Sequence, residues 1–138
     1  MQKIILSVLV LLSFTIQANE LPTFTDIAEA VSHGKQLTFM MNVKKCTSEK
    51  SLGKVVGSVT PNAVMLIDNN RITASDRHFT LLDNPDTLAN PGFEYSKYNI
   101  TADGKVSVKI TLMNATNYEQ LSSFQMSCAL GEGFKVFG

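Results

Sequence analysis

The chain has 138 residues, 12 of them basic and 12 acidic, so its formal net charge is zero. This length suits one ordinary domain. The balanced charge provides no general field that attracts nucleic acid or an anionic membrane, and we expect no nucleic-acid partner. Four lysines cluster between residues 44 and 54, but that segment has no aromatic residue on which a base could stack.

The first 18 residues have the three parts of a secretory signal peptide. Lys3 supplies the positive start, residues 4–12 form an apolar run, and the small Ala18 is a suitable cleavage position. The apolar run is about half of the ~20 residues that span a bilayer, so we expect no transmembrane segment. The sequence therefore predicts a signal peptide over residues 1–18 and a single β-rich domain over residues 19–138, located in the periplasm or secreted.

The predicted domain begins with one short helix and then changes to strands. Thr25 can cap a helix over Asp26–His33, and Gly34 follows as its stop signal. Apolar and polar residues alternate from Gln36 to Val43, which predicts a half-buried strand. Turn residues then separate four further strands, over residues 52–60, 63–67, 71–75 and 79–82.

Residues 83–94 are expected to form the longest irregular segment, because Pro85 and Pro91 interrupt regular structure. Long loops in compact domains are often functional. The segment also carries three acids, which we interpret as solvated residues rather than as the carboxylate pair of a glycosidase: Asp83, Asp86 and Glu94.

The strongest local signal is a hairpin in the second half of the chain. Residues 95–102 and 105–114 alternate in polarity on either side of the turn Asp103-Gly104. Two more strands follow, Phe124–Leu130 and Phe134–Phe137. Short strands joined by hairpins predict a mainly β fold, an antiparallel meander that forms a barrel-like sheet or a two-layer sandwich, with the N-terminal helix over an open end or edge.

Cys46 and Cys128 are the two cysteines of the chain. An even number in an exported protein most simply pairs, which predicts a disulfide that joins residues 128 − 46 = 82 positions apart. The alternatives are two buried free thiols or part of a metal site. A metal site is disfavoured because no CxxC spacing is present and the histidines are only His33 and His78. We expect no metal and no cofactor.

A possible ligand or partner site is formed by Asp76, His78, Phe93 and Tyr95. Asp76 and His78 are two residues apart, so they can share one face of a strand and hydrogen-bond. Ser75 would point to the opposite face, and no nucleophile motif surrounds it, so we assign no catalytic residue. Phe93 and Tyr95 lie beside the irregular segment and could form the lip of a binding site.

Four segments resemble the VirK family of small exported bacterial proteins: TFTDIAEAVSHGKQLTF with Cys46 after it, RITASDRHFTLL, YSKYNITADGKVSVKITLMNATNYE and SCALGEGFKVF. They span nearly all of residues 19–138 in the family's order. The resemblance implies a bacterial envelope or secreted protein linked by name to virulence, and it supplies no activity and no catalytic residues. The positions that it marks most strongly are Cys46, His78, Phe79, Thr80, Cys128, Gly131 and Gly133.

Three functions follow as hypotheses. The first is a non-enzymatic binding module that acts on an unknown envelope, extracellular or host protein or on a small ligand. The second is a β-barrel carrier of a small molecule, with a lumen lined by Phe39, Val108, Ile110 and Phe124. The third is a small hydrolase that uses Asp76 and His78.

Overall fold

The computed structural model describes residues 17–84 and 87–138, without the side chains of residues 83–89. Most of the predicted signal peptide therefore lies outside the described residues, as do the side chains of Asp83 and Asp86. In the described ranges, no helix has the length and apolar character that crossing a membrane requires.

Helix α1 (Phe24–Ser32) begins earlier than predicted, and its N-cap is Thr23 rather than Thr25. The Asp26 N–H donates to Thr23 Oγ1 over 3.2 Å, and the Thr23 N–H donates to Asp26 Oδ2 over 3.1 Å. This reciprocal pair is a capping box, which satisfies two backbone donors at the start of the helix. The buried residues of the helix are Ile27 and Ala30.

A small antiparallel sheet has the strand order β3-β1-β9. Its central strand β1 (Thr38–Asn42) pairs with β3 (Val56–Val59) on one side and with β9 (Phe134–Phe137) on the other. Phe39 points into the core, as the alternation predicts, and the short turn η1 (Val43–Lys45) follows β1.

A larger antiparallel sheet has the strand order β2-β8-β7-β6-β5-β4. From β4 to β8 each strand pairs with the next one along the chain, which confirms the predicted meander. The strands are β2 (Thr47–Ser48), β4 (Ala63–Ile67), β5 (Arg71–Asn84), β6 (Thr87–Thr101), β7 (Lys105–Asn114) and β8 (Gln120–Ala129).

The two longest strands differ from the prediction. Strand β5 runs without interruption through Ser75-Asp76-Arg77, where the sequence predicts a break. Strand β6 begins at Thr87, so most of the segment predicted to be irregular, 83–94, is strand. The pairing of β5 with β6 continues along both strands, and this long ladder outweighs the local turn signals.

Pro91 is tolerated inside β6 because of the direction in which its missing N–H would point. In an antiparallel strand the N–H and C=O of one residue face the same neighbour. The Pro91 carbonyl accepts from the Ala115 N–H over 3.3 Å, on the β7 side, where the pairing with β7 has already ended at Gly92. The proline therefore removes no hydrogen bond from the ladder with β5.

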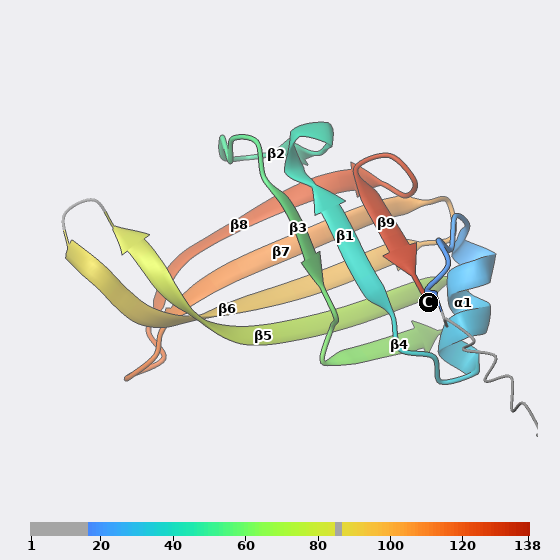
Figure 1. Ribbon diagram of the computed structural model, residues 1–138, viewed down its shortest axis with the longest axis horizontal. Helices are drawn as coiled ribbons and strands as arrows, with labels where there is room; N and C mark the ends of the chain where they lie inside the picture. Colours follow the sequence, from blue (N-terminus) through green and yellow to red (C-terminus); the bar gives the residue numbers. More distant parts are fainter. Residues whose placement is uncertain (1–16, 85–86) are drawn as a thin grey trace, which may run out of the picture.

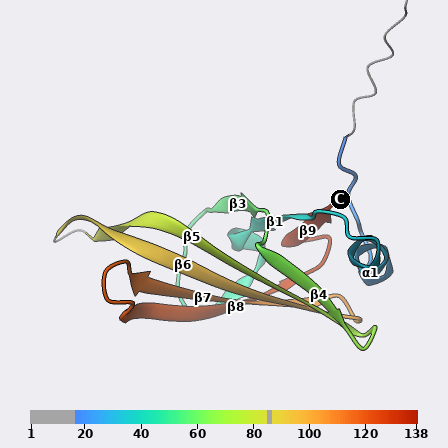
Figure 2. The same cartoon turned by 90° about the horizontal axis from the view of Figure 1, so that it is seen from below.

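The two sheets stack as two layers, and α1 lies at one end of the stack, next to β4 (Figures 1 and 2). This arrangement confirms the sandwich alternative, since the sheets form no closed barrel. The side chains that fill the space between the layers include Ile27, Leu37, Phe39, Ile72, Ile100, Val106, Val108, Phe134 and Val136.

The small sheet covers only part of the large one. Its strands have 4 or 5 residues, whereas β5 and β6 have 14 and 15. At roughly 3.3 Å per residue the long strands extend well beyond their cover. Figure 1 shows β5 and β6 continuing past β3, away from α1.

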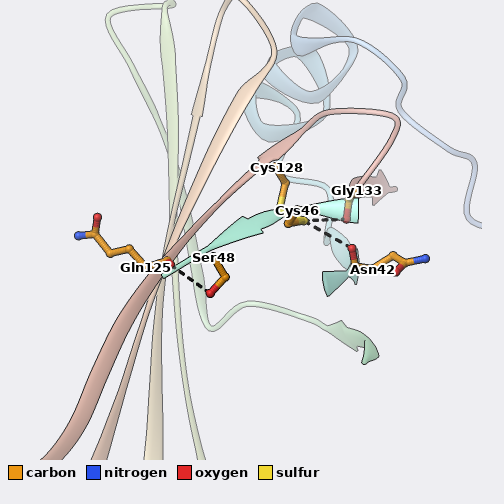
Figure 3. The surroundings of a disulfide bond; sticks show 6 residues. All are labelled: Asn42, Cys46, Ser48, Gln125, Cys128 and Gly133. Atoms are coloured by element: carbon orange, nitrogen blue, oxygen red, sulfur yellow. Dashed lines mark hydrogen bonds between the residues drawn. A yellow bond between two sulfur atoms is a disulfide. The ribbon is translucent and has the colours of Figure 1, made fainter. Parts of the chain in front are cut away.

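The predicted disulfide is present, and it joins the connection between η1 and β2 to strand β8 (Figure 3). Cys46 follows η1, and Cys128 lies on the buried face of β8, with 4.5 Å between their Cα atoms. Cys46 Sγ lies 3.5 Å from the Asn42 carbonyl and 3.7 Å from the Gly133 carbonyl. A disulfide sulfur carries no hydrogen, so these are packing contacts.

Candidate functional site

A pocket of about 330 Å³ opens between the two sheets, at the place where the large sheet extends beyond the small one. We call it the inter-sheet pocket. The small-sheet side contributes residues from β1, β3, β9 and the segments beside them: Phe39, Met41, Val43, Leu52, Val55, Gly57, Ser58, Val59 and Phe134. The large sheet contributes His78, Glu94, Tyr98, Ile110, Phe124 and Met126.

The large-sheet wall of the pocket is divided into a polar half and an apolar half. Strand register places Asp76, Ser96, Ile110 and Phe124 in one row across β5 to β8. The next row contains His78, Glu94, Leu112 and Ser122. The polar side chains of β5 and β6 thus stand beside the apolar side chains of β7 and β8.

Asp76 and His78 lie on the same face of β5 and contact each other. His78 Nδ1 is 3.2 Å from Asp76 Oδ2, and since a carboxylate only accepts, the Nδ1–H is the donor. The Asp76 side chain is 6% exposed, whereas that of His78 is 49% exposed. The buried carboxylate therefore orients the imidazole, and the other edge of the ring is accessible from the pocket.

Glu94, Ser96 and Tyr98 continue the polar wall on β6. The Ser96 hydroxyl donates to Glu94 Oε1 over 3.2 Å. Burial raises the pKa of Tyr98, and the negative charges of Asp76 and Glu94 raise it further, while a hydrogen bond with Ser96 acts in the opposite direction. The wall thus presents the carboxyl group of Glu94, the imidazole of His78 and the hydroxyl of Tyr98, with Asp76 and Ser96 buried beside them.

The opposite rim of the pocket carries a lysine. Lys50 Nζ lies 5.4 Å from the centre of the Phe124 ring and donates to the Ser122 hydroxyl over 2.8 Å. The pocket therefore has an apolar floor and a wall that carries Glu94 and His78, and Lys50 lies beside Phe124 on its β8 side.

The four predicted site residues do not form one site. His78 lines the inter-sheet pocket and Asp76 is buried beside it on the same face of β5, whereas Phe93 and Tyr95 alternate with Glu94 and point to the opposite face of β6. On that face Phe93 packs edge-to-face against Phe79 and Tyr95.

The sequence interpretation missed the part that Glu94 and Tyr98 have in the pocket. It assigned Glu94 to a loop. Tyr98, whose alternation with its neighbours predicts a core residue, is buried at 4% exposure and also borders the pocket. The period-two alternation with Ser96 could have grouped these three residues, but only if the strand had been predicted to continue through residue 94. In the described part of the chain, no group of three or more His, Cys, Asp or Glu side chains is arranged to hold a metal ion.

Comparison with known proteins gives a family and one solved structure. The family model described as VirK protein matches residues 20–118. The crystal structure of a VirK family protein from Legionella pneumophila matches with a TM-score of 0.81 and 55% sequence identity, over 86% of this chain and 98% of that one. No curated protein matches the chain.

Proposed function

The chain belongs to the VirK family, and on that premise we propose that it is an exported, non-enzymatic binding protein that holds its ligand in the inter-sheet pocket. The observation that carries this proposal is the pocket itself, about 330 Å³ of mostly apolar space with a few polar groups on one wall. Small-molecule sites have this character, with volumes of roughly 300–1,000 Å³. A role in virulence, which the family name implies, is part of the same proposal.

The pocket favours a ligand with an apolar body and a hydrogen-bond donor or a positive charge at one end. Phe124, which is partly exposed, supplies aromatic surface for the apolar body, and the buried rings of Phe39 and Phe134 lie behind the pocket. Glu94 places negative charge on one wall and Asp76 adds to it from behind His78, so a protonated amine would be attracted both by these carboxylates and by the nearby aromatic ring of Phe124.

Binding of the neutral probe N-phenyl-1-naphthylamine tests whether the pocket takes a ligand. Gly57 pairs with Met41 and alternates with Val59, so it faces inward, and an added Cβ meets no atom within 4 Å. Gly57→Leu should fill the pocket without a clash and abolish probe fluorescence. Val56→Leu, at a 63% exposed position of β3 that alternates with Gly57 and does not line the pocket, is the control and should bind like wild type. Equal binding by both variants would contradict the proposal.

The charge preference has a separate test. Octylamine should displace the probe at a lower concentration than octanoate. The acidic wall of the pocket attracts the protonated amine of octylamine and repels the carboxylate of octanoate. Glu94→Gln should reduce this difference while binding of the neutral probe is retained. A preference for octanoate in the wild-type protein would be the opposite of what the acidic wall predicts.

Export is the second part of the proposal, and residues 1–18 support it. When the full chain is expressed in a bacterium, the protein should leave the cytoplasm and have an N-terminus near Asn19. Intact-mass measurement of the periplasmic and medium fractions checks this expectation. Full-length protein that stays in the cytoplasm would refute it.

The hydrolase alternative rests on the contact between Asp76 and His78, whose imidazole lines the pocket. It requires a nucleophile hydrogen-bonded to the imidazole, and in the described part of the chain the His78 ring has its hydrogen bond with Asp76 alone. The binding function therefore fits the geometry better. A hydrolytic activity that His78→Ala abolishes without unfolding the protein would reverse this ranking.

A further inference from the structure

The large sheet has a second face that no other element of the described chain covers. We call it the outer face, the side of β4 to β8 turned away from the small sheet and from α1 (Figure 2). Its residues alternate with the buried ones, and many of them are exposed, including Ser107, Lys109, Gln125 and Ser127 on β7 and β8. This exposed face of five strands is available to a partner.

Charge is divided unequally between the two faces. Five strand residues of the outer face are basic: Arg71, Arg77, Lys97, Lys105 and Lys109. None of the strand residues on this face whose side chains the structure describes is acidic, whereas Glu94 lines the inter-sheet pocket and Asp76 is buried beside it. A chain without net charge thus presents a positive surface on one side.

Two of the lysines are direct neighbours. Lys97 and Lys109 are partners in the register of β6 and β7, between Ser75 on β5 and Gln125 on β8. Like charges directly opposite each other in a sheet are destabilising. Within the described ranges neither lysine has an ion pair, whereas Lys105 is bound to Asp103 over 3.2 Å. Positive charge is therefore concentrated at this pair without neutralisation by the protein.

The same face becomes apolar toward its far end. Phe79 and Leu81 on β5 are 60% and 59% exposed, Tyr118 in the turn after β7 is 55% exposed, and Leu121 at the start of β8 is 52% exposed. Phe93 joins these residues to the basic region, since Arg77 lies 5.2 Å from the centre of its ring. Large exposed side chains gathered in one area commonly mark an interaction surface.

From this combination we infer that the outer face docks on a lipid surface that carries anionic headgroups. The lysine and arginine side chains would contact the headgroup phosphates, while the side chains of Phe79, Leu81 and Leu121 enter the interfacial layer. This inference is independent of the ligand in the inter-sheet pocket, which lies on the other side of the sheet.

Other occupants fit this face less well. Two copies of the chain would bring like charges together. Single-stranded nucleic acid needs free aromatic faces, but the ring of Phe93 already contacts Arg77 and stacks on Tyr118, with a 2° angle between the planes. The exposed leucines offer a base no stacking surface, whereas a bilayer would remove them from water.

Co-sedimentation with vesicles tests the electrostatic part. Protein purified from cells that express the full chain should bind vesicles of phosphatidylcholine and phosphatidylglycerol, and it should not bind phosphatidylcholine alone. Lys97→Gln/Lys109→Gln should weaken binding roughly 30-fold, because each basic residue near an anionic leaflet contributes about a fivefold factor. Lys44→Gln/Lys45→Gln is the matched control, since it removes the same charge from exposed positions in η1 and should change binding little.

A second pair of variants tests the apolar part. Leu81→Ser should weaken vesicle binding several-fold. The binding that remains in this variant should be more sensitive to salt, because it depends more on the charged residues. Val56→Ser removes an equally exposed apolar side chain, at 63% exposure, from β3 and should bind like wild type. Circular dichroism should show the same fold in all variants. All variants also have the same N-terminal sequence, so that segment cannot explain a difference in vesicle binding between them.

Three outcomes would overturn the inference. The first is the absence of wild-type binding to phosphatidylglycerol vesicles. The second is an equal loss of binding in the two double-lysine variants. The third is strong binding of a single-stranded oligonucleotide that Lys97→Gln/Lys109→Gln abolishes while vesicles are not bound, which would assign the face to nucleic acid.

Discussion

Gly133 occupies a position where a side chain has no space. A Cβ atom added there would lie 2.8 Å from Cys46 Sγ and 2.9 Å from the Lys45 carbonyl oxygen, and neither of these atoms can move freely. Gly133→Ala should therefore lower the free energy of unfolding by about 1–3 kcal/mol. Gly57→Ala is the control, because its Cβ meets nothing within 4 Å. Denaturant unfolding of both variants checks the difference, and equal midpoints would contradict it.

Asp103 has an unusually acidic side chain at the turn between β6 and β7. Hydrogen bonds from the Thr101 side chain and from Lys105 lower the pKa of Asp103 from 3.8 to about 2. A lowered folded-state pKa stabilises the protein above the unfolded-state pKa, and this stabilisation is lost as the pH falls from about 3.8 through about 2. NMR titration should give a pKa of about 2 in wild type and a higher value in Thr101→Val. An unchanged value in Thr101→Val would refute the assigned cause.

At the scale of elements, the helix tests which threonine is the cap. Thr23→Ala removes the capping box and should lower the free energy of unfolding by about 1 kcal/mol. Thr25→Ala changes an exposed residue of the first turn and should have less than half of that effect. Thermal or denaturant melts compare the two variants. A larger loss of unfolding free energy in Thr25→Ala than in Thr23→Ala would instead support Thr25 as the N-cap, as the sequence pattern predicts.

Local patterns predicted the presence of most elements better than their length. The alternation over residues 105–114 and the turn at Asp103-Gly104 are local properties, and the structure has that hairpin. Strands β5 and β6 are longer than predicted because their extent depends on pairing with each other. Pro91 shows the reason, since its effect on a strand depends on which neighbour its missing N–H faces.

At the scale of the whole molecule, the disulfide between Cys46 and Cys128 joins two segments that are 82 residues apart in the sequence. Cys46→Ala/Cys128→Ala should lower the free energy of unfolding by about 4–5 kcal/mol in the chain-entropy description, because the unfolded chain loses its long closed loop. Urea unfolding measures this loss, and dithiothreitol should destabilise wild type but not the double variant. Native exported protein should also contain no titratable thiol, and finding two would contradict the pairing.

The candidate site was only partly predictable for a related reason. The spacing of Asp76 and His78 indicates that they share a strand face, and their contact has that geometry. Whether this face borders a pocket depends on the small sheet, whose strands come from residues 38–42, 56–59 and 134–137. The spacing of Phe93 and Tyr95 likewise shows that they share a face, but not that it is the outer one.

The sequence by itself determined the properties that depend on local order and composition: one N-terminal helix, alternating strands, an antiparallel meander, and two cysteines suited to a disulfide. The tertiary structure alone decided how long the strands are, which face of the large sheet is covered, and where the charges lie. Alternation defines two faces of a strand, but the covering layer is assembled from distant segments. For this reason a chain without net charge can place Glu94 at a pocket on one side of the large sheet and five basic strand residues on the other.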